Sequence, residues 1–276
     1  MLDVVKKHID RRLRLPQLRG FTDKDFDSPS HARIQQEIFE QKPVLQFLYR
    51  EYARLFIRSA SAVPPAGRMV EVGSGPNILK KFVPNIITSD VARLDGVDLV
   101  FSASKLPFKD ASLDRLFFMY VFHHVSDAEG LLNEAYRCLK NNGEMVIIDP
   151  AINAFSKFYY SYMHVDMLDV HAEKWGFSGG GRLSASNIAL LWIVLERDKE
   201  LFHRKFPRFQ VEETEYVNCI SFLLSGGFRL RQLAPAWFIK GLFRCERWFM
   251  KRVSRSIAVS MSVVIRKKAN GASHDE

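Results

Sequence analysis

Between residues 68 and 150, short apolar runs alternate with stretches of helical periodicity, and this alternation restricts the fold more than any other feature. Five of the runs are predicted strands, at 68–72, 85–89, 97–101, 113–120 and 144–148. Strands that alternate with helices pair in parallel and are covered by helices on both faces of the sheet. The pattern therefore predicts an α/β fold with a doubly wound, mostly parallel sheet.

The helices of this region are read from the same periodicity. A helix is expected to start at 78–82, and a second one is expected over 127–140, where leucines and alanines recur on one face. The run Asn141-Asn142-Gly143 is expected to stop the second helix, because glycine commonly follows the last helical turn. Two later segments, 210–217 and 257–266, are strand candidates that extend the sheet to seven strands with an antiparallel edge.

The segments on either side of this core differ from it. Residues before Pro64-Pro65 have helical spacing, and residues after 150 lose the strand–helix rhythm and are rich in aromatic side chains. We expect an N-terminal helical lid at 1–66 and a cofactor-binding core at 67–150. A substrate cap with a late strand is expected at 151–256, and a last strand with a disordered tail at 257–276.

Composition narrows the class of protein. The 276 residues are 47% apolar and 26% charged, as in soluble globular proteins. Cys138, Cys219 and Cys245 form no Cys-x-x-Cys pair, so a disulfide framework and a structural zinc site are excluded. The longest apolar run, 188–195, is far shorter than the roughly 20 residues that a membrane-spanning helix needs. We expect a cytoplasmic protein, with neither a signal peptide nor a membrane span.

Positive charge is concentrated near one end. Residues 229–268 contain eleven lysines and arginines against one acid, Glu246, whereas the whole chain carries +9. A local excess argues against nucleic acid as a partner and for a local patch. Segment 236–252 interleaves basic with large aromatic residues, as interfacial membrane helices do. The competing interpretation is a helix that packs its aromatic side chains inward. RNA binding is a third interpretation, although no recognisable RNA-binding module accompanies the patch.

A glycine turn follows the first predicted strand. Gly73 and Gly75 let the backbone turn sharply and approach a ligand. A dinucleotide-binding loop would require a third glycine where this chain has Ile78. Glu71 at the strand end would repel a pyrophosphate but suits a ligand with an amino group. After the next strand, Asp90 is placed either to bind the hydroxyls of a ribose or to serve as an ordinary turn residue.

Further motifs follow the glycine turn in order. They are Leu106-Pro107-Phe108 with Ser112-Leu113-Asp114, then Val121-Phe122-His123-His124-Val125, then Glu134-Ala-Tyr-Arg-Cys-Leu-Lys140-Asn-Asn-Gly143. Together with Glu71-Val-Gly-Ser-Gly75, over residues 68–150, they resemble the class I S-adenosylmethionine-dependent methyltransferases, specifically the methyltransferase type 11 group. The resemblance implies a Rossmann-like sheet and S-adenosylmethionine as cofactor.

The resemblance also implies which residues meet that cofactor. Those expected to bind it are Glu71, Gly73, Ser74 and Gly75 at the methionine end, Asp90 at the ribose, Ser102 and Ala103 near the adenine, and Tyr120. The family often has an acid near the adenine, where this chain has Ser102-Ala103. Asn77 replaces the third glycine of the family loop, and asparagine tolerates the left-handed backbone conformation.

Candidates for acceptor chemistry lie after the fourth strand and in the cap. His123 and His124 are candidate catalytic residues, since a histidine can act as general base near neutral pH. The alternative is that they only pack at the strand end. Candidate substrate-binding residues in the cap are Tyr159, Tyr160, His164, Asp166 and Asn187. No metal site is expected, because no cluster of ligands is evident in the sequence.

The sequence therefore favours an S-adenosylmethionine-dependent methyltransferase with a small-molecule or lipid-linked acceptor. A peripheral contact of 236–252 with the inner face of the membrane would bring the enzyme to a membrane-proximal substrate. The alternative is a non-catalytic scaffold or cofactor-binding protein of the same fold, suggested by Asn77 and Ser102. A nicotinamide-dependent oxidoreductase is disfavoured by Ile78 and Glu71.

Overall fold

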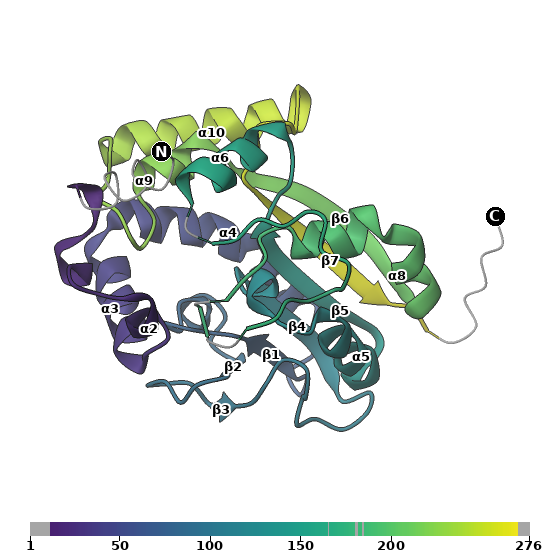
Figure 1. Cartoon of the computed structure of the whole chain (residues 1–276). Helices are drawn as coiled ribbons and strands as arrows, with labels where there is room; N and C mark the ends of the chain where they lie inside the picture. The colour runs from purple at the N-terminus through teal and green to yellow at the C-terminus, as the bar shows by residue number, and fades with distance from the viewer. Residues whose placement is uncertain (1–11, 165, 180–181, 184, 270–276) are drawn as a thin grey trace.

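A seven-stranded sheet forms the centre of the molecule in a computed structural model, which describes residues 12–164, 166–179, 182–183 and 185–269 (Figure 1). The strands lie in the order β3-β2-β1-β4-β5-β7-β6. Their bounds are β1 Met69–Val72, β2 Ile87–Asp90, β3 Leu99–Val100, β4 Leu113–Met119, β5 Leu139–Pro150, β6 Phe209–Asn218 and β7 Ser260–Lys267. Strand β7 runs antiparallel to both of its neighbours, and the other pairs are parallel. The predicted doubly wound, mostly parallel seven-stranded sheet is confirmed.

Helices cover both faces of this sheet. The α-helices are α2 Asp23–Phe26, α3 Pro29–Gln41, α4 Pro43–Ser61, α5 Ala128–Cys138, α6 Ala154–Met163, α7 Leu190–Trp192, α8 Lys199–Lys205, α9 Ile220–Ser225 and α10 Ala236–Arg252. Short 3-10 turns lie at Pro16–Leu18, Leu79–Lys81 and Phe122–His124, and a π-helical turn at Ile193–Arg197. Proline occupies the first turn of both α3 and α4, where its missing N–H costs nothing.

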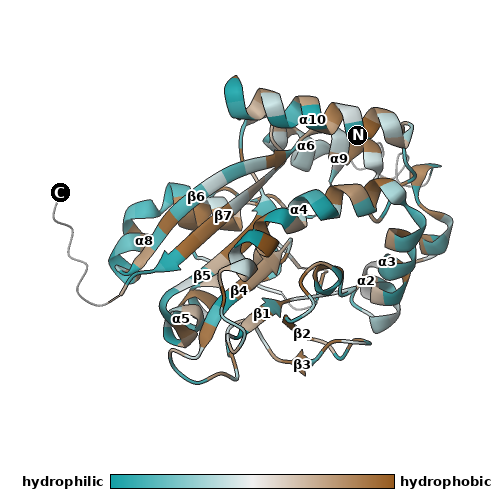
Figure 2. Cartoon of the chain, turned by 180° about the vertical axis from the view of Figure 1, so that it is seen from behind, coloured by the Kyte–Doolittle hydropathy of each residue, from teal (hydrophilic) through white to brown (hydrophobic). Residues whose placement is uncertain are grey.

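Two apolar clusters, one on each face, hold the sheet between its helices. On β4, Leu116 and Phe118 join the cluster that includes α5 and α8, whereas Phe117 between them joins the cluster that includes α4 and α10. This alternation follows from the two-residue period of a strand. Figure 2 shows β7 coloured hydrophobic over most of its length, as expected for a strand buried between two others.

Two local predictions are wrong in their limits. The helix expected over 127–140 ends at Cys138, and β5 begins at Leu139, which pairs with Leu113. The register then shifts, and Asn142 adopts a left-handed φ of 63°. The Asn141-Asn142-Gly143 run is therefore an irregularity inside the strand, not a helix stop. The helix expected to start at 78–82 is only the 3-10 turn Leu79–Lys81.

The last predicted strand, 257–266, ends one residue too early. Lys267 is the last residue of β7, it is buried, and its Nζ donates to the carbonyl oxygen of Leu139 at 2.7 Å. The side chain therefore ties the final strand to the start of β5. The part of the predicted tail from 270 onward, and residues 1–11 of the predicted lid, lie outside the described residues.

Candidate active site

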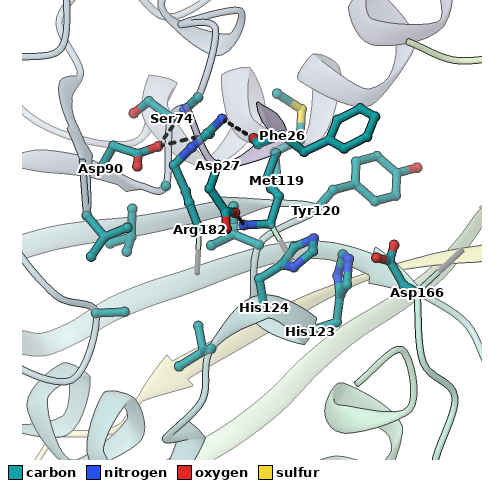
Figure 3. Close-up of a pocket in the computed structure, with 18 of the residues that line it drawn as sticks. Phe26, Asp27, Ser74, Asp90, Met119, Tyr120, His123, His124, Asp166 and Arg182 are labelled. Atoms are coloured by element: carbon teal, nitrogen blue, oxygen red, sulfur yellow. Dashed lines mark hydrogen bonds and ion pairs between the residues drawn. The ribbon is translucent and has the colours of Figure 1, made fainter. Parts of the chain in front are cut away.

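A cavity of about 820 Å³ opens where β1, β2 and β4 end at their carboxyl edge. Ligands of open α/β sheets bind at this edge, because the loops that follow the strands meet there. The predicted lid contributes Phe26, Asp27 and His31 to its wall, and the predicted cap contributes residues from α6 and the loop that follows. Figure 3 shows side chains from the core, the lid and the cap around one space.

We divide this cavity into two parts. The glycine-loop half comprises Glu71, Gly73, Ser74, Gly75, Asp90, Ser102 and Ala103. The histidine half comprises Tyr120, His123, His124, Tyr159, Tyr160, His164 and Asp166. Of the residues that the sequence singled out for a site, all but Asn187 line this cavity.

Backbone conformation in the glycine loop requires its small residues. Gly73 has φ 72°, and a Cβ there would lie 2.6 Å from a methyl carbon of Val121. Gly75 also has a left-handed φ, of 50°. Asn77 adopts φ 59°, so the expectation that asparagine can replace the third glycine of the loop is confirmed.

Asp90 is buried at the end of β2 and is already engaged on one side. Its Oδ2 accepts a hydrogen bond from the backbone N–H of Gly75 at 3.1 Å, and its Oδ1 accepts one from Ala92 at 3.2 Å. These bonds fix the carboxylate against the glycine loop. Asp90 therefore makes the hydrogen bonds of a turn residue and also lines the cavity, so the two interpretations of this side chain are compatible.

Arg182 lies across the glycine-loop half, which the sequence did not predict. Its Nη1 is 3.8 Å from Oδ2 of Asp90, and its Nη2 donates to the carbonyl oxygen of Phe26 at 3.3 Å. Figure 3 shows the guanidinium between these two groups. The neighbouring backbone N–H of Leu183 donates to Asp27 Oδ1 at 2.6 Å, so the loop at 182–183 is fastened to the residue that follows α2.

Glu71 is a buried carboxyl group with an unpartnered oxygen. Only 1% of the residue is exposed, and Oε2 has no hydrogen-bond partner within the described part of the chain. Burial raises the pKa of this carboxyl group to about 8, and the nearby Asp90 contributes in the same direction. A cationic ligand group placed there would restore the ionised form.

Ser102 and Ala103 line the cavity at the place where the family often has an acid. The Ser102 hydroxyl lies 3.1 Å from the Ser104 hydroxyl. Ser102 and Ala103 supply no carboxylate to this part of the cavity. Tyr120, at the end of β4, has φ 58°, a strained backbone conformation for a tyrosine. Its hydroxyl donates to Ser260 at 3.0 Å, so its ring rather than its hydroxyl is available to a ligand.

His123 and His124 follow β4 in a short 3-10 turn and are both mostly buried. Nδ1 of His123 lies 2.8 Å from Oδ1 of Asp149, a carboxylate with no exposed surface. Burial disfavours charge on His123, but the Asp149 carboxylate outweighs this and raises the histidine pKa. Burial, together with the neighbouring His123, lowers the pKa of His124 to about 3. The adjacent rings therefore have opposite tendencies to ionise.

The predicted substrate residues separate into two groups. Tyr159, Tyr160, His164 and Asp166 line the histidine half. Asn187 is fully buried, and its side chain accepts a hydrogen bond from Ala189 N–H while donating one to the carbonyl oxygen of Asp169. It is not among the cavity-lining residues, and its backbone N–H donates to the carbonyl oxygen of His123 at 2.8 Å. Asn187 thus supports the loop rather than facing a substrate.

The expectation that no ligand cluster exists also needs correction. His123, His124 and Asp166 each present a ligand atom, and these atoms lie within 4.8 Å of one another. Asp166 is far from the histidine pair in the sequence, so spacing alone could not reveal the cluster.

Comparison with known proteins places this geometry in a family. Residues 77–147 match the family described as a methyltransferase domain. The chain contains a methyltransferase domain and is a homologue of class I S-adenosylmethionine-dependent methyltransferases. The matched part begins after Gly73 and Gly75, so the interpretation of the glycine loop depends on its geometry and not on this match. The resemblance drawn from the sequence motifs is confirmed.

Two curated relatives are similar over part of their length. The ubiquinone/menaquinone biosynthesis C-methyltransferase UbiE of Desulfotalea psychrophila is 29% identical over 133 residues, which are 40% of this chain and 54% of that protein. The demethylmenaquinone methyltransferase of Listeria monocytogenes is 29% identical over 115 residues, or 40% of this chain and 47% of that protein. The chain therefore spans about half the length of these relatives.

Among solved structures, geranyl diphosphate C-methyltransferase from Streptomyces coelicolor is similar with a TM-score of 0.45. Its sequence is 12% identical, and the match covers 81% of this chain and 80% of that one. Across the described residues, no helix is both long enough and apolar enough to cross a membrane.

Proposed function

We propose that this chain transfers the methyl group of S-adenosylmethionine to a small-molecule acceptor. The observation that carries the proposal is the buried, unpartnered carboxyl oxygen of Glu71 beside the left-handed glycine loop. Such a carboxylate suits the amino group of the cofactor's methionine part. Asp90, on the adjacent strand, has the place and the acceptor atoms to bind the ribose hydroxyls.

The cavity supports a reaction between two bound molecules. When bound, S-adenosylmethionine supplies an electrophilic methyl group on a positively charged sulfur. About 820 Å³ is near the upper end of the range for ligand pockets, roughly 300–1,000 Å³, and extends from the glycine-loop half into the histidine half. The residues of the histidine half would orient the acceptor and exclude water, which is the main requirement when the acceptor is already nucleophilic. From an acceptor that carries a proton, we propose that His123 receives it, because Asp149 raises the pKa of His123 whereas the lowered pKa of His124 makes that ring a weak base.

Relatives suggest the class of acceptor. The names of the two curated relatives refer to ubiquinone and menaquinone biosynthesis and to demethylmenaquinone. We propose, for this chain, a quinone-like or other lipid-linked acceptor that enters between the lid and cap segments predicted at 1–66 and 151–256. The rings of Tyr159 and Tyr160 offer it an aromatic wall.

Helix α10 supports a membrane-proximal acceptor. Trp237 and Trp248 are 75% and 63% exposed, although Phe243 of the same helix is buried. Glu246, the one acid in 229–268, turns inward and accepts a hydrogen bond from the Ser221 N–H at 2.8 Å. The outer surface of α10 therefore combines tryptophans with lysines and arginines and carries no acid of its own, as interfacial helices do. We propose a cytoplasmic enzyme that binds the inner face of the membrane peripherally through 236–252.

Calorimetric titration tests the activity class first. S-adenosylmethionine and S-adenosylhomocysteine are expected to bind with micromolar dissociation constants, and NAD is expected not to bind. Asp90→Ala should weaken binding of both ligands. A folded protein that binds neither would overturn the proposal and leave the non-catalytic scaffold as the better interpretation.

Vesicle flotation tests the membrane contact. The wild-type protein should float with vesicles that contain anionic lipid and much less with neutral ones. Trp237→Ala combined with Trp248→Ala should abolish flotation, whereas Ile57→Ala, at an exposed position on α4, should not affect it. Equal flotation of the tryptophan variant and the wild type would exclude α10 as the contact.

A further inference from the structure

We infer that His123, His124 and Asp166 form a binding site for one divalent transition-metal ion of the zinc type. Their ligand atoms lie within 4.8 Å of one another, and the two imidazole centroids are 4.2 Å apart. Ligands that share one zinc ion at metal–ligand distances of about 2.0–2.2 Å lie roughly 3–3.5 Å apart. The side chains thus need to move together by only about 1–2 Å to coordinate an ion.

Hydrogen bonds already orient both histidines as in metal sites. Nδ1 of His124 lies 3.1 Å from the carbonyl oxygen of Ala185, which can only accept, so this nitrogen carries the proton. In the same way, Nδ1 of His123 donates to Asp149 Oδ1 at 2.8 Å. In the neutral rings, Nε2 then carries the lone pair that can bind an ion. Metal-binding histidines usually donate their second nitrogen to a carboxylate or a backbone carbonyl, as these two do.

Asp166 completes the donor set from a different element. It follows α6, and its backbone N–H donates to Nδ1 of His164 at 3.2 Å, which ties the residue to the end of that helix. Figure 3 shows Asp166 on the side of His123 away from the glycine loop. Two histidines and one carboxylate suit zinc and similar ions, whereas magnesium prefers oxygen ligands alone. Three protein ligands also leave coordination positions open to a substrate, as catalytic zinc sites do.

The position of the site indicates a catalytic role for the ion, and this role rests on the proposed function. All three residues line the cavity that also contains the glycine loop. An ion there would bind a hydroxyl oxygen of the acceptor and lower its pKa, so that the hydroxyl proton is released to solvent. The oxygen would then form a bond to the methyl carbon, and the carbon–sulfur bond would break with its electron pair retained by sulfur. The inference therefore assigns the acceptor to hydroxylated compounds, such as a phenol.

Metal titration tests the site without any cofactor. The protein is stripped with a chelator and titrated with Zn²⁺, and separately with Co²⁺, whose visible absorption reports nitrogen coordination. We expect one equivalent of each ion to bind and Mg²⁺ not to compete at equal concentration. His124→Ala and Asp166→Asn should each weaken Zn²⁺ binding by at least about 100-fold, with His171→Ala, an exposed histidine, as the matched control. Melting curves show that each variant is folded.

Each outcome separates this inference from the proposed function. Absence of stoichiometric Zn²⁺ binding, or equal binding by wild type and Asp166→Asn, overturns the metal site even when S-adenosylhomocysteine binds normally. Zn²⁺ binding that depends on His124 and Asp166 supports the site even when S-adenosylhomocysteine does not bind, a result that would reject the methyltransferase proposal instead. Competition by Mg²⁺ would overturn the assignment to a zinc-type ion.

Discussion

The two halves of the cavity are built in opposite ways. The glycine-loop half is made by residues 71–103, which lie at the ends of β1, β2 and β3 or just after them. It is stiffened by hydrogen bonds such as that from the backbone N–H of Gly75 to Asp90. The histidine half combines His123 from the turn after β4, Tyr159 from α6 and Asp166 from the segment after α6, and Asp149 of β5 supports it from behind His123. The difference indicates a fixed site for a constant ligand beside an assembled site that can vary with the acceptor.

The largest effect is expected from a change in the fixed half. In Gly73→Arg, the new Cβ would lie within 3 Å of Val121 in a left-handed backbone conformation. Overpacking and backbone strain together should weaken S-adenosylhomocysteine binding on the order of 1000-fold. Calorimetry measures this, and Gly241→Ala, in open space on α10, is the control. Unchanged affinity would contradict the assignment of the loop.

A change in the assembled half should affect turnover and not cofactor affinity. The His124→Ala variant lacks an imidazole that lines the acceptor side and belongs to the inferred metal site, so kcat should fall by about 100-fold. Its S-adenosylhomocysteine affinity should stay within about twofold of wild type, since the two halves are separate. Rates with an acceptor, measured beside calorimetry, check both values. A parallel loss of affinity would show that the halves are not independent.

The buried carboxyl group of Glu71 gives the fixed half a characteristic pH dependence. Its pKa of about 8 means that the neutral form predominates at lower pH, while binding of an ammonium group requires the ionised form. Affinity should therefore rise about tenfold per pH unit between pH 6 and 7.5. It should fall again above about pH 8, where the ligand's own amino group loses its proton.

A substitution distinguishes the contribution of Glu71 to this pH dependence from the contributions of its neighbours. In Glu71→Gln the rise between pH 6 and 7.5 should disappear, although Asp90 still faces the same site. Calorimetry in buffers of different ionisation enthalpy would also detect release of one proton on binding below pH 8 in the wild type. A pH-independent affinity in the wild type would show that Glu71 does not meet the amino group.

The smallest effect is expected at the boundary between the halves. Arg182→Ala removes the ion pair with Asp90 and should strengthen S-adenosylhomocysteine binding by about threefold to tenfold, because the ligand no longer displaces the guanidinium. Arg197→Ala, whose guanidinium pairs with Asp198, is the matched control. Weaker binding in Arg182→Ala would mean that the arginine holds the ligand instead of competing with it.

The same contrast explains how far the sequence could be interpreted. The strand, the glycine turn and Asp90 lie within a short stretch, where local conformation and apolar periodicity determine what is adjacent. The histidine pair was also recognisable, but its partners were not. Asp149 and Asp166 meet it only through parallel pairing of β4 with β5 and through the path of the cap, which periodicity cannot specify.

Loop residues gave the least information. Arg182 belongs to a Ser- and Gly-rich stretch with no helical or strand pattern, so nothing indicated that it would reach Asp90. Residue type alone predicts a substrate contact for Asn187, but complete burial and its hydrogen bonds within the loop give it a supporting position. The helix limit at Cys138 was missed because strand pairing of Leu139 with Leu113 prevailed over local helical preference.

On the proposed function, the arginine beside Asp90 makes cofactor binding an exchange of a guanidinium for ribose hydroxyls at that carboxylate. On that function, a ligand that displaces the guanidinium from Asp90 would also break its bond to Phe26, which joins the loop at 182–183 to the end of α2. Part of the free energy of binding at Asp90 would then be used to loosen the contact between these two segments. A protein built in this way would admit its second substrate more readily once the first is in place, giving an order of binding without a separate regulatory site.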